Sequence, residues 1–306
     1  SRNIRLAHGS IQVSVMDDLI DKVKNFITTH IGSSICLCSN DEYLLQWICP
    51  RVVEMITKEY LTLNEPGIDD IRYMIDFLYS AANDSYKIVF IHRAERILQE
   101  ATNSMLKILE EPPFNSAIVL TTTRFTDLLP TVRSRVKTLN VFVDKGIFES
   151  LKERFLNHPK IDLILTLCKD DFEILRYIQQ VEEIPSDVQF EESEFIKMFV
   201  EGEIAAQDRL KMALMLDDLC TRFSKWTEKD LVQLYLSIMK NSDEIDLNMM
   251  VFLMCRILQK ILELRGYRDV STFKWLDSIL TNRLMNFNGS LTLLNLLILI
   301  KKTAKR

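Results

Sequence analysis

Two arginines, Arg133 and Arg135, are the residues whose type and spacing best suit chemistry in this chain of 306 residues. An arginine keeps its charge at physiological pH and presents a planar fork of N–H donors, which matches an oxyanion such as phosphate. The six cysteines form no Cys-x-x-Cys pair and no cluster with histidine at metal-ligand spacing, so they predict reduced thiols and no metal site. On arginine frequency alone, a surface arginine that binds carbonyls or a carboxylate is the preferred interpretation of Arg135.

The loop that would hold phosphate in a nucleotide-binding α/β domain lacks the residues for that task. The apolar run Ile35–Cys38 predicts the first strand, and a loop bearing Asp41 and Glu42 follows it. Residues 33–66 contain no glycine, and residues 25–57 contain no lysine. A phosphate cradle needs glycine backbone N–H groups and a lysine, whereas two carboxylates repel phosphate. The loop after the first predicted strand therefore lacks the glycines and the lysine that bind phosphate.

The segment from 87 to 136 supplies the elements that must position the two arginines. Lys87–His92 reads as a buried strand, and Ala117–Thr123 reads as another. Between them we expect an amphipathic helix that ends at Pro112, because proline lacks the N–H that a helix interior needs. Its apolar face comprises Ala94, Ile97, Leu98, Ala101, Met105, Ile108 and Leu109. Strand, helix and strand predict a parallel crossover unit, followed by a short helix with Pro130 in its first turn.

The rest of the chain extends this unit into a sheet and then into helices. Leu61–Leu63 and Val136–Val143 predict two more strands, and Asp69 or Asp70 starts a helix after the turn at Gly67. From Ile147 onward we find no convincing strand. We expect helices over residues 147–157, 161–167, 170–181, 192–200, 205–223, 228–239, 247–264, 272–286 and 291–301.

Composition and charge narrow the class of protein. The net charge of -5 speaks against a free-standing, strongly basic DNA-binding protein, so any DNA contact is local or shared with partners. No segment reaches the roughly 20 apolar residues that a membrane-spanning helix needs. We therefore expect a cytoplasmic protein.

Two stretches carry a resemblance to a known family. The sequence Asn103–Pro113, which contains Leu-Glu-Glu-Pro-Pro, and the sequence Leu129–Arg135, which ends in Ser-Arg, closely resemble the clamp-loader subunits of bacterial DNA polymerase III. The match is to the delta-prime subunit and its gamma/tau relatives, within the AAA+ superfamily. Ile68–Arg72 also resembles the helix start that precedes the Walker B strand in that family, so the resemblance covers residues 68–143.

The resemblance implies a second loss at the nucleotide site. Active members end the strand that corresponds to Lys87–His92 with an aspartate for magnesium and a glutamate that orients the attacking water. This chain has His92 and Arg93 at those positions. Together with the missing cradle (no Walker A), this predicts no nucleotide binding, no hydrolysis, no metal and no cofactor.

The resemblance also implies roles for particular residues. Arg135 corresponds to the arginine finger that reaches a neighbouring subunit's γ-phosphate in trans, and Arg133 supports it; Val136 stands where the family has cysteine. The alternative is a surface arginine that binds carbonyls or a carboxylate. Asn103 and Lys107 lie one helical turn apart and are possible DNA contacts, although a solvated lysine is an equal reading.

The fold we expect is an α/β AAA+-like module, a five-stranded parallel sheet with flanking helices, followed by a helical lid and an all-α C-terminal collar domain. Residues 1–15 read as an added or disordered leader, with the first helix starting at Met16. Residues 16–144 would form the degenerate AAA+ domain, 145–190 the lid and 191–306 the collar.

The function we expect is that of a non-hydrolysing, delta-prime-like subunit of the polymerase III clamp loader. It would supply Arg135 in trans and hold the ring together through its collar helices. The implied partners are the gamma/tau and delta subunits, with the sliding clamp and primer-template DNA reached through the assembly. Two alternatives stay open: a helical interaction protein that acts outside replication, and an ATPase with a non-standard phosphate site.

Overall fold

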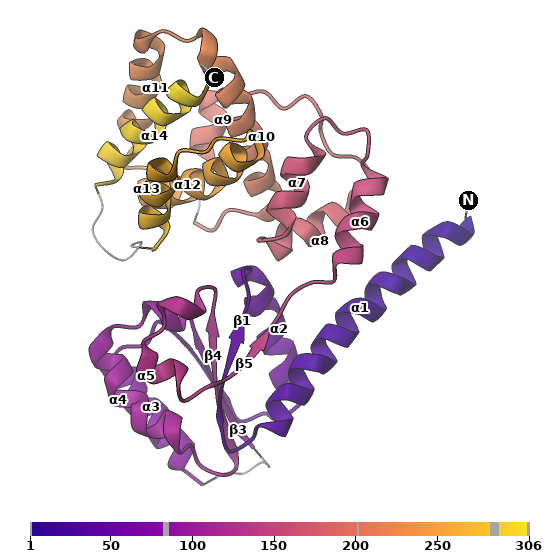
Figure 1. Cartoon of the computed structure of the whole chain (residues 1–306), viewed down its shortest axis with the longest axis vertical. Coiled ribbons are helices and arrows are strands. Elements are labelled where there is room, and N and C mark those ends of the chain that lie inside the picture. Colours follow the sequence, from indigo (N-terminus) through magenta and orange to yellow (C-terminus); the bar gives the residue numbers. More distant parts are fainter. Residues whose placement is uncertain (1, 82–85, 201, 282–287, 305–306) are drawn as a thin grey trace. The chain divides into compact units, whose positions relative to one another are not determined.

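The computed structural model describes residues 2–81, 86–200, 202–281 and 288–304, and side chains within these ranges from Met16 to Thr303 (Figure 1). The chain forms two compact units. The α/β unit comprises Ser1–Ser150 with Lys169–Phe172, and the helical unit comprises Leu151–Cys168 with Glu173–Arg306. The predicted division at residue 190 between lid and collar stays a prediction.

The α/β unit is built on a five-stranded parallel sheet in the order β2-β3-β4-β1-β5. The strands are β1 (Ser34–Cys38), β2 (Tyr60–Asn64), β3 (Lys87–His92), β4 (Ser116–Thr122) and β5 (Lys137–Asn140). All five were predicted, and the AAA+-like fold class is confirmed. Every residue of β3 and β4 is buried, as expected of central strands covered on both faces. The edge strand β5 is shorter than the predicted Val136–Val143.

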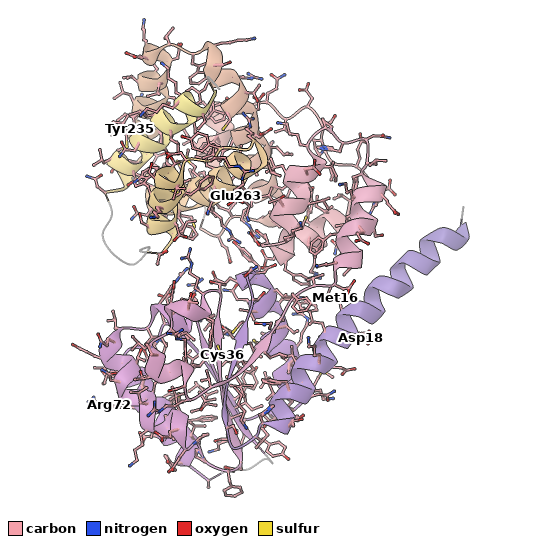
Figure 2. All side chains as sticks on the ribbon, viewed as in Figure 1. Met16, Asp18, Cys36, Arg72, Tyr235 and Glu263 are labelled. Carbon is pink, nitrogen blue, oxygen red and sulfur yellow. The ribbon has the colours of Figure 1, made fainter. Side chains whose placement is uncertain are left out.

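Helices cover the sheet, and their apolar faces form the core. The helices of this unit are α1 (Arg2–Thr29), α2 (Glu42–Glu54), α3 (Ile68–Tyr79), η1 (Ala94–Arg96), α4 (Gln99–Glu110), η2 (Phe125–Asp127), α5 (Pro130–Arg133) and the start of α6 (Lys145–Arg154). A core cluster joins Cys36 and Val89 of the sheet to Ile71 of α3, Met105 of α4 and Val132 of α5. Figure 2 labels Cys36, whose side chain is fully buried against the sheet.

Four local predictions differ from the structure. The first helix begins at Arg2, not at Met16, because residues 2–15 contain no proline and propagation of a helix is easier than its nucleation. Leu98 is 73% exposed and lies before α4 in an extended conformation, so it does not join the predicted apolar face. Helix α2 was not predicted, since Pro50 lies inside it. Helix α3 begins at Ile68, before the predicted start at Asp69 or Asp70, and Asp70 Oδ2 accepts from Gly67 N at its N-cap.

The described part of the helical unit contains helices joined by loops and no strand, as predicted from Ile147 onward. They are the end of α6 with α7 (Ile161–Cys168), α8 (Phe172–Gln180), α9 (Glu192–Lys197), α10 (Ala206–Arg222), η3 (Phe223–Lys225), α11 (Glu228–Lys240), α12 (Leu247–Leu264), α13 (Val270–Thr281) and α14 (Gly289–Ala304). The predicted end of the thirteenth helix at residue 286 lies outside the described residues. No helix among the described residues is long and apolar enough to cross a membrane.

A buried lysine joins α3 to the sheet. The Lys87 side chain is 1% exposed, and its Nζ donates to Phe77 O at 2.7 Å, to Ser80 O at 2.7 Å and to Ser80 Oγ at 2.6 Å. These acceptors lie at the carboxyl end of α3, where a positive charge complements the helix dipole. Lys87 therefore fixes the end of α3 against the first residue of β3.

Replacing Lys87 with methionine keeps the apolar stem and removes the ammonium group. We expect the free energy of unfolding to fall by about 2–3 kcal/mol, because buried carbonyls lose their donor. Urea unfolding followed by circular dichroism measures it. Lys137→Met is the matched control, since Lys137 also opens a strand but is exposed. Equal losses in the two variants would contradict this account of Lys87.

Candidate functional site

The carboxyl ends of the parallel strands bring the candidate residues to one edge of the sheet. Asp41 and Glu42 follow β1, Arg93 follows β3, and Thr121 lies in β4 next to its end. Ligands of open parallel sheets bind at this edge. It is the edge where the sequence predicts a lost nucleotide site.

The start of α2 is occupied by carboxylates of the chain itself. Asp41 is 4% exposed, and its Oδ1 accepts from Leu44 N at 3.1 Å as the N-cap of α2. Ser39 Oγ accepts from Asp41 N at 3.1 Å and fixes the turn. The free N–H groups at a helix start are what a bound phosphate uses. Here a side-chain anion takes one of them and places negative charge beside the rest.

Arg93 stands at the end of β3 in an ion cluster with Glu42, Glu65 and Arg96. Its Nε donates to Glu42 Oε1, and its Nη1 donates to Glu65 Oε1 at 3.1 Å. Arg96 Nη1 donates to the same Glu65 oxygen at 3.3 Å. Burial works against the charge of Arg93, but the Glu42 and Glu65 carboxylates raise the pKa of its guanidinium above the ordinary value. The cluster has two cations and two anions, so its charges balance.

Two members of this ion cluster have a left-handed backbone. The φ angles of Glu65 and Arg93 are 48° and 55°, and they are the positive φ values recorded at residues other than glycine in the described part of the chain. Such conformations cost of order 1–3 kcal/mol for a residue with a side chain. Backbone strain and paired charges therefore coincide at the ends of β2 and β3.

His92 is part of the buried wall of this edge. It is 6% exposed, and its Nδ1 lies 2.9 Å from Thr121 Oγ1, so the threonine of the neighbouring strand orients the ring. Burial lowers the pKa of the His92 imidazole below its ordinary value, which favours the neutral form. Among the described residues no group of three or more His, Cys, Asp or Glu side chains could hold a metal ion.

A cavity of about 610 Å³ opens beside these residues in the α/β unit. Its lining includes Asp41 at the start of α2, the aromatic rings of Phe142 and Phe148, and the cations Lys145 and Lys169. Both lysines are exposed. The cavity has the size of a small-ligand site, but acidic side chains, Asp41 among them, share its lining with the lysines.

Arg135 lies at the surface after α5, as an arginine finger requires. Its side chain is 27% exposed. Nε and Nη2 donate to Glu110 Oε2 at 3.2 and 3.0 Å, and Nη1 donates to Thr131 O at 2.8 Å. These are also the contacts of the alternative, a surface arginine that binds a carboxylate and a carbonyl. The geometry within one chain therefore agrees with both interpretations of Arg135, as an arginine finger and as a surface arginine.

The other predicted site residues fall into two groups. Arg133 Nε is buried and has no hydrogen-bond partner among the described residues, so its predicted supporting role finds no visible contact through that atom. Asn103 and Lys107 are exposed on α4, where partners can reach them. Sequence reasoning missed Glu65 and Glu110 as partners of the arginines, because both pairings join residues far apart in sequence.

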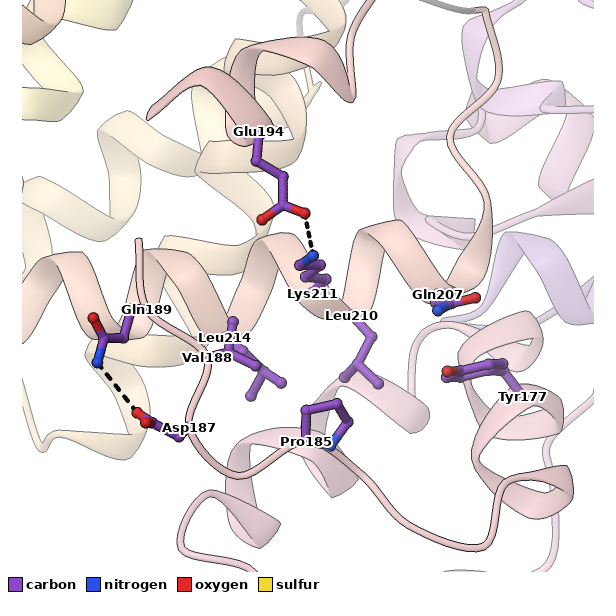
Figure 3. Close-up of a pocket in the computed structure, with 10 residues that line it drawn as sticks. All are labelled: Tyr177, Pro185, Asp187, Val188, Gln189, Glu194, Gln207, Leu210, Lys211 and Leu214. Atoms are coloured by element: carbon purple, nitrogen blue, oxygen red, sulfur yellow. Dashed lines mark hydrogen bonds and ion pairs between the residues drawn. The ribbon is translucent and has the colours of Figure 1, made fainter. Parts of the chain in front are cut away.

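The helical unit contains a second cavity, of about 350 Å³, between α8, α10 and the segment before α9 (Figure 3). Leu210 and Leu214 of α10 line it. Its charged side chains find partners across the rim: Glu194 pairs with Lys211, and Asp187 Oδ1 accepts from Gln189 Nε2 at 3.5 Å. The polar groups that line this cavity give no sign of a particular ligand.

Comparison with known proteins finds a DNA polymerase III family model in each unit. The family model "DNA polymerase III, delta subunit" matches residues 35–144, and "DNA polymerase III gamma subunit-related, C-terminal domain" matches residues 219–302. The delta-prime subunit of Yersinia pestis is 40% identical over 70 residues, which are 22% of this chain and 21% of that protein. The delta-prime subunit of Haemophilus influenzae is 33% identical over 91 residues, 29% of this chain and 28% of that protein. Each of these alignments spans less than a third of the relative's length.

A solved structure extends the likeness to the whole chain. A DNA polymerase III gamma subunit-related protein from Thermotoga maritima is 30% identical, with a TM-score of 0.63. The match covers 94% of this chain and 99% of that chain. Similarity of sequence and fold over nearly the full length of both proteins shows that this chain belongs to the gamma subunit-related family of DNA polymerase III clamp-loader-type subunits.

Proposed function

We propose that this chain is a delta-prime-type clamp-loader subunit that does not hydrolyse ATP and completes a neighbour's ATP site with Arg135. The observation that carries the proposal is the ion cluster at the carboxyl edge of the sheet. Glu42 and Asp41 lie where phosphate would need cations, and Arg93 lies where magnesium would need an acid. The charges at the phosphate position and at the magnesium position are thus opposite to those that a nucleotide site needs.

Electrostatics explains why this reversal opposes ATP. A triphosphate would approach two carboxylates at the start of α2, and magnesium would approach the Arg93 guanidinium. Repulsion between unit charges about 4 Å apart is of the order of 4 kcal/mol near a protein surface. Binding would also have to break the Glu42–Arg93 pair, which leaves a half-buried charge without a partner. The subunit would keep its fold without nucleotide.

The finger role of Arg135 rests on chemistry and position together. Arg135 is the second residue of the Ser-Arg motif that the family shares, and its guanidinium lies at the surface. A second subunit's triphosphate could therefore reach it. In this proposal the helical unit, which contains the second family match at residues 219–302, holds the ring of gamma/tau and delta subunits together.

DNA would meet this subunit only within the assembly. Asn103 and Lys107 lie exposed on α4 and could contact a phosphate of primer-template DNA, while the net charge of -5 disfavours binding by the isolated chain. The sliding clamp would likewise be reached through the complex.

One observation favours a second candidate, an ATPase with a non-standard phosphate site. Lys145 and Lys169 line the cavity beside β1, and two exposed cations could attract a nucleotide. A helical interaction protein outside replication is a further class. Failure of the chain to copurify with gamma/tau and delta subunits of its own organism would favour that class.

Titration calorimetry of the purified chain with magnesium-ATP separates the first two candidates. We expect no saturable heat at millimolar ATP, because the helix start is capped by Asp41 and the edge carries Glu42. An ATPase subunit of the same loader is the positive control. Saturable binding that Lys145→Ala or Lys169→Ala abolishes would overturn the non-hydrolysing assignment.

Replacing Arg135 with alanine tests the finger directly. We expect the reconstituted loader to assemble normally and its DNA-stimulated ATP hydrolysis to fall by about tenfold at the site that Arg135 completes, below the roughly 10³–10⁵-fold effect of arginine fingers in GTPases. Phosphate release measures turnover, and size-exclusion chromatography measures assembly. Arg72→Ala is the control, because Arg72 is an exposed arginine paired with Asp69 on the same unit. Wild-type turnover in Arg135→Ala would remove the assignment.

A further inference from the structure

A single carboxylate oxygen of Glu110 binds one edge of the Arg135 guanidinium. Glu110 is the last residue of α4, and its Oε2 accepts from both Nε and Nη2 of Arg135, at 3.2 and 3.0 Å. Arg135 follows α5, so this contact joins the ends of two helices. On the other side, Nη1 donates to Thr131 O of α5 at 2.8 Å. The guanidinium is thus held from two directions.

These contacts leave donors free for a second oxyanion. Nη1 and Nη2 each carry two N–H bonds. The contacts with Glu110 and Thr131 use one N–H on each of these nitrogens, and the approach of Nη1 to Ser134 Oγ is long, at 3.5 Å. Nη2 therefore retains one N–H bond, and the second N–H bond of Nη1 makes only the long contact with Ser134 Oγ. If a phosphate oxygen replaced that contact, the two nitrogens could bind two oxygens of one phosphate, the bidentate geometry that arginine prefers.

The exposure of the two side chains indicates that Glu110 orients the Arg135 guanidinium without burying it. The Arg135 side chain is 27% exposed and the Glu110 side chain is 60% exposed, so water screens the carboxylate and the guanidinium stays accessible. An unrestrained arginine at the surface would sample many rotamers, and a reacting group held in one geometry loses less entropy when the transition state forms.

We propose that Glu110 is a positioning residue: it fixes the guanidinium of Arg135 so that the Nη1 and Nη2 end of the fork faces a triphosphate bound by the neighbouring subunit. This inference rests on the proposed function, because it needs Arg135 to be the finger. Glu110 itself touches neither ATP nor the attacking water. Its effect on hydrolysis passes through Arg135 alone.

The test uses the complete clamp loader reconstituted with full-length chains that carry Glu110→Ala, Arg135→Ala or both changes. Glu111→Ala is the matched control, because it removes the same charge from the adjacent exposed residue, whose carboxylate makes no recorded contact with Arg135 among the described residues. For Glu110→Ala we expect kcat of DNA-stimulated hydrolysis to fall by about threefold, less than for Arg135→Ala, because a misplaced guanidinium keeps part of its effect. The KM for ATP should stay unchanged, since the neighbour binds the nucleotide.

The double variant and a conservative variant complete the test. In the Arg135→Ala background, Glu110→Ala should lower kcat no further, and Glu110→Gln should retain part of the rate because its amide oxygen still accepts one N–H. A further loss in the double variant would show that Glu110 acts elsewhere and would overturn the inference. So would unchanged or faster turnover in Glu110→Ala, provided that Arg135→Ala is slow; the proposed function would then stand. Unchanged turnover in Arg135→Ala would instead overturn the proposed function and this inference with it.

Discussion

The ion pair between Glu42 and Arg93 is the interaction that sets the charge at the carboxyl edge of the sheet. It connects the first turn of α2 to the residue that follows β3, across the edge where parallel sheets bind their ligands. Glu65 extends the pair to the end of β2 through contacts with Arg93 and Arg96. Because Glu65 and Arg93 both have left-handed backbone, the pairing also offsets strain of a few kcal/mol. Side chains of the protein thus balance one another's charges at this edge.

On the proposed function, this pairing would let the subunit keep its sheet without bound ATP. Central strands β3 and β4 are buried throughout, and Lys87 fixes α3 to β3 from within. Neither feature involves the carboxyl edge. These interactions therefore stabilise the sheet independently of the carboxyl edge, as the proposed non-hydrolysing role would require.

Sequence patterns predicted the strands and most helices because those elements follow from local periodicity and turn residues. Lys87–His92 and Leu247–Leu264 match the structure at both ends. Predictions were wrong where tertiary context decides: Leu98 fits a helical spacing but lies outside α4, in an extended conformation. The candidate arginines could be chosen from sequence, yet their partners could not. Glu110 precedes Arg135 by a full strand and two short helices, and only the folded chain brings them together.

Arg93 and Arg135 show why counter-charge, more than exposure, separates a structural arginine from one that could serve a neighbour. Their side chains are 30% and 27% exposed, which is nearly equal. Arg93 faces Glu42 and Glu65, each 23% exposed, so poorly screened anions from two sides neutralise it. Arg135 faces one carboxylate, Glu110, that is 60% exposed and well screened by water. On the proposed function, this weaker counter-charge would leave the Arg135 guanidinium available to a second subunit's triphosphate, whereas Arg93 is paired within the chain from two sides.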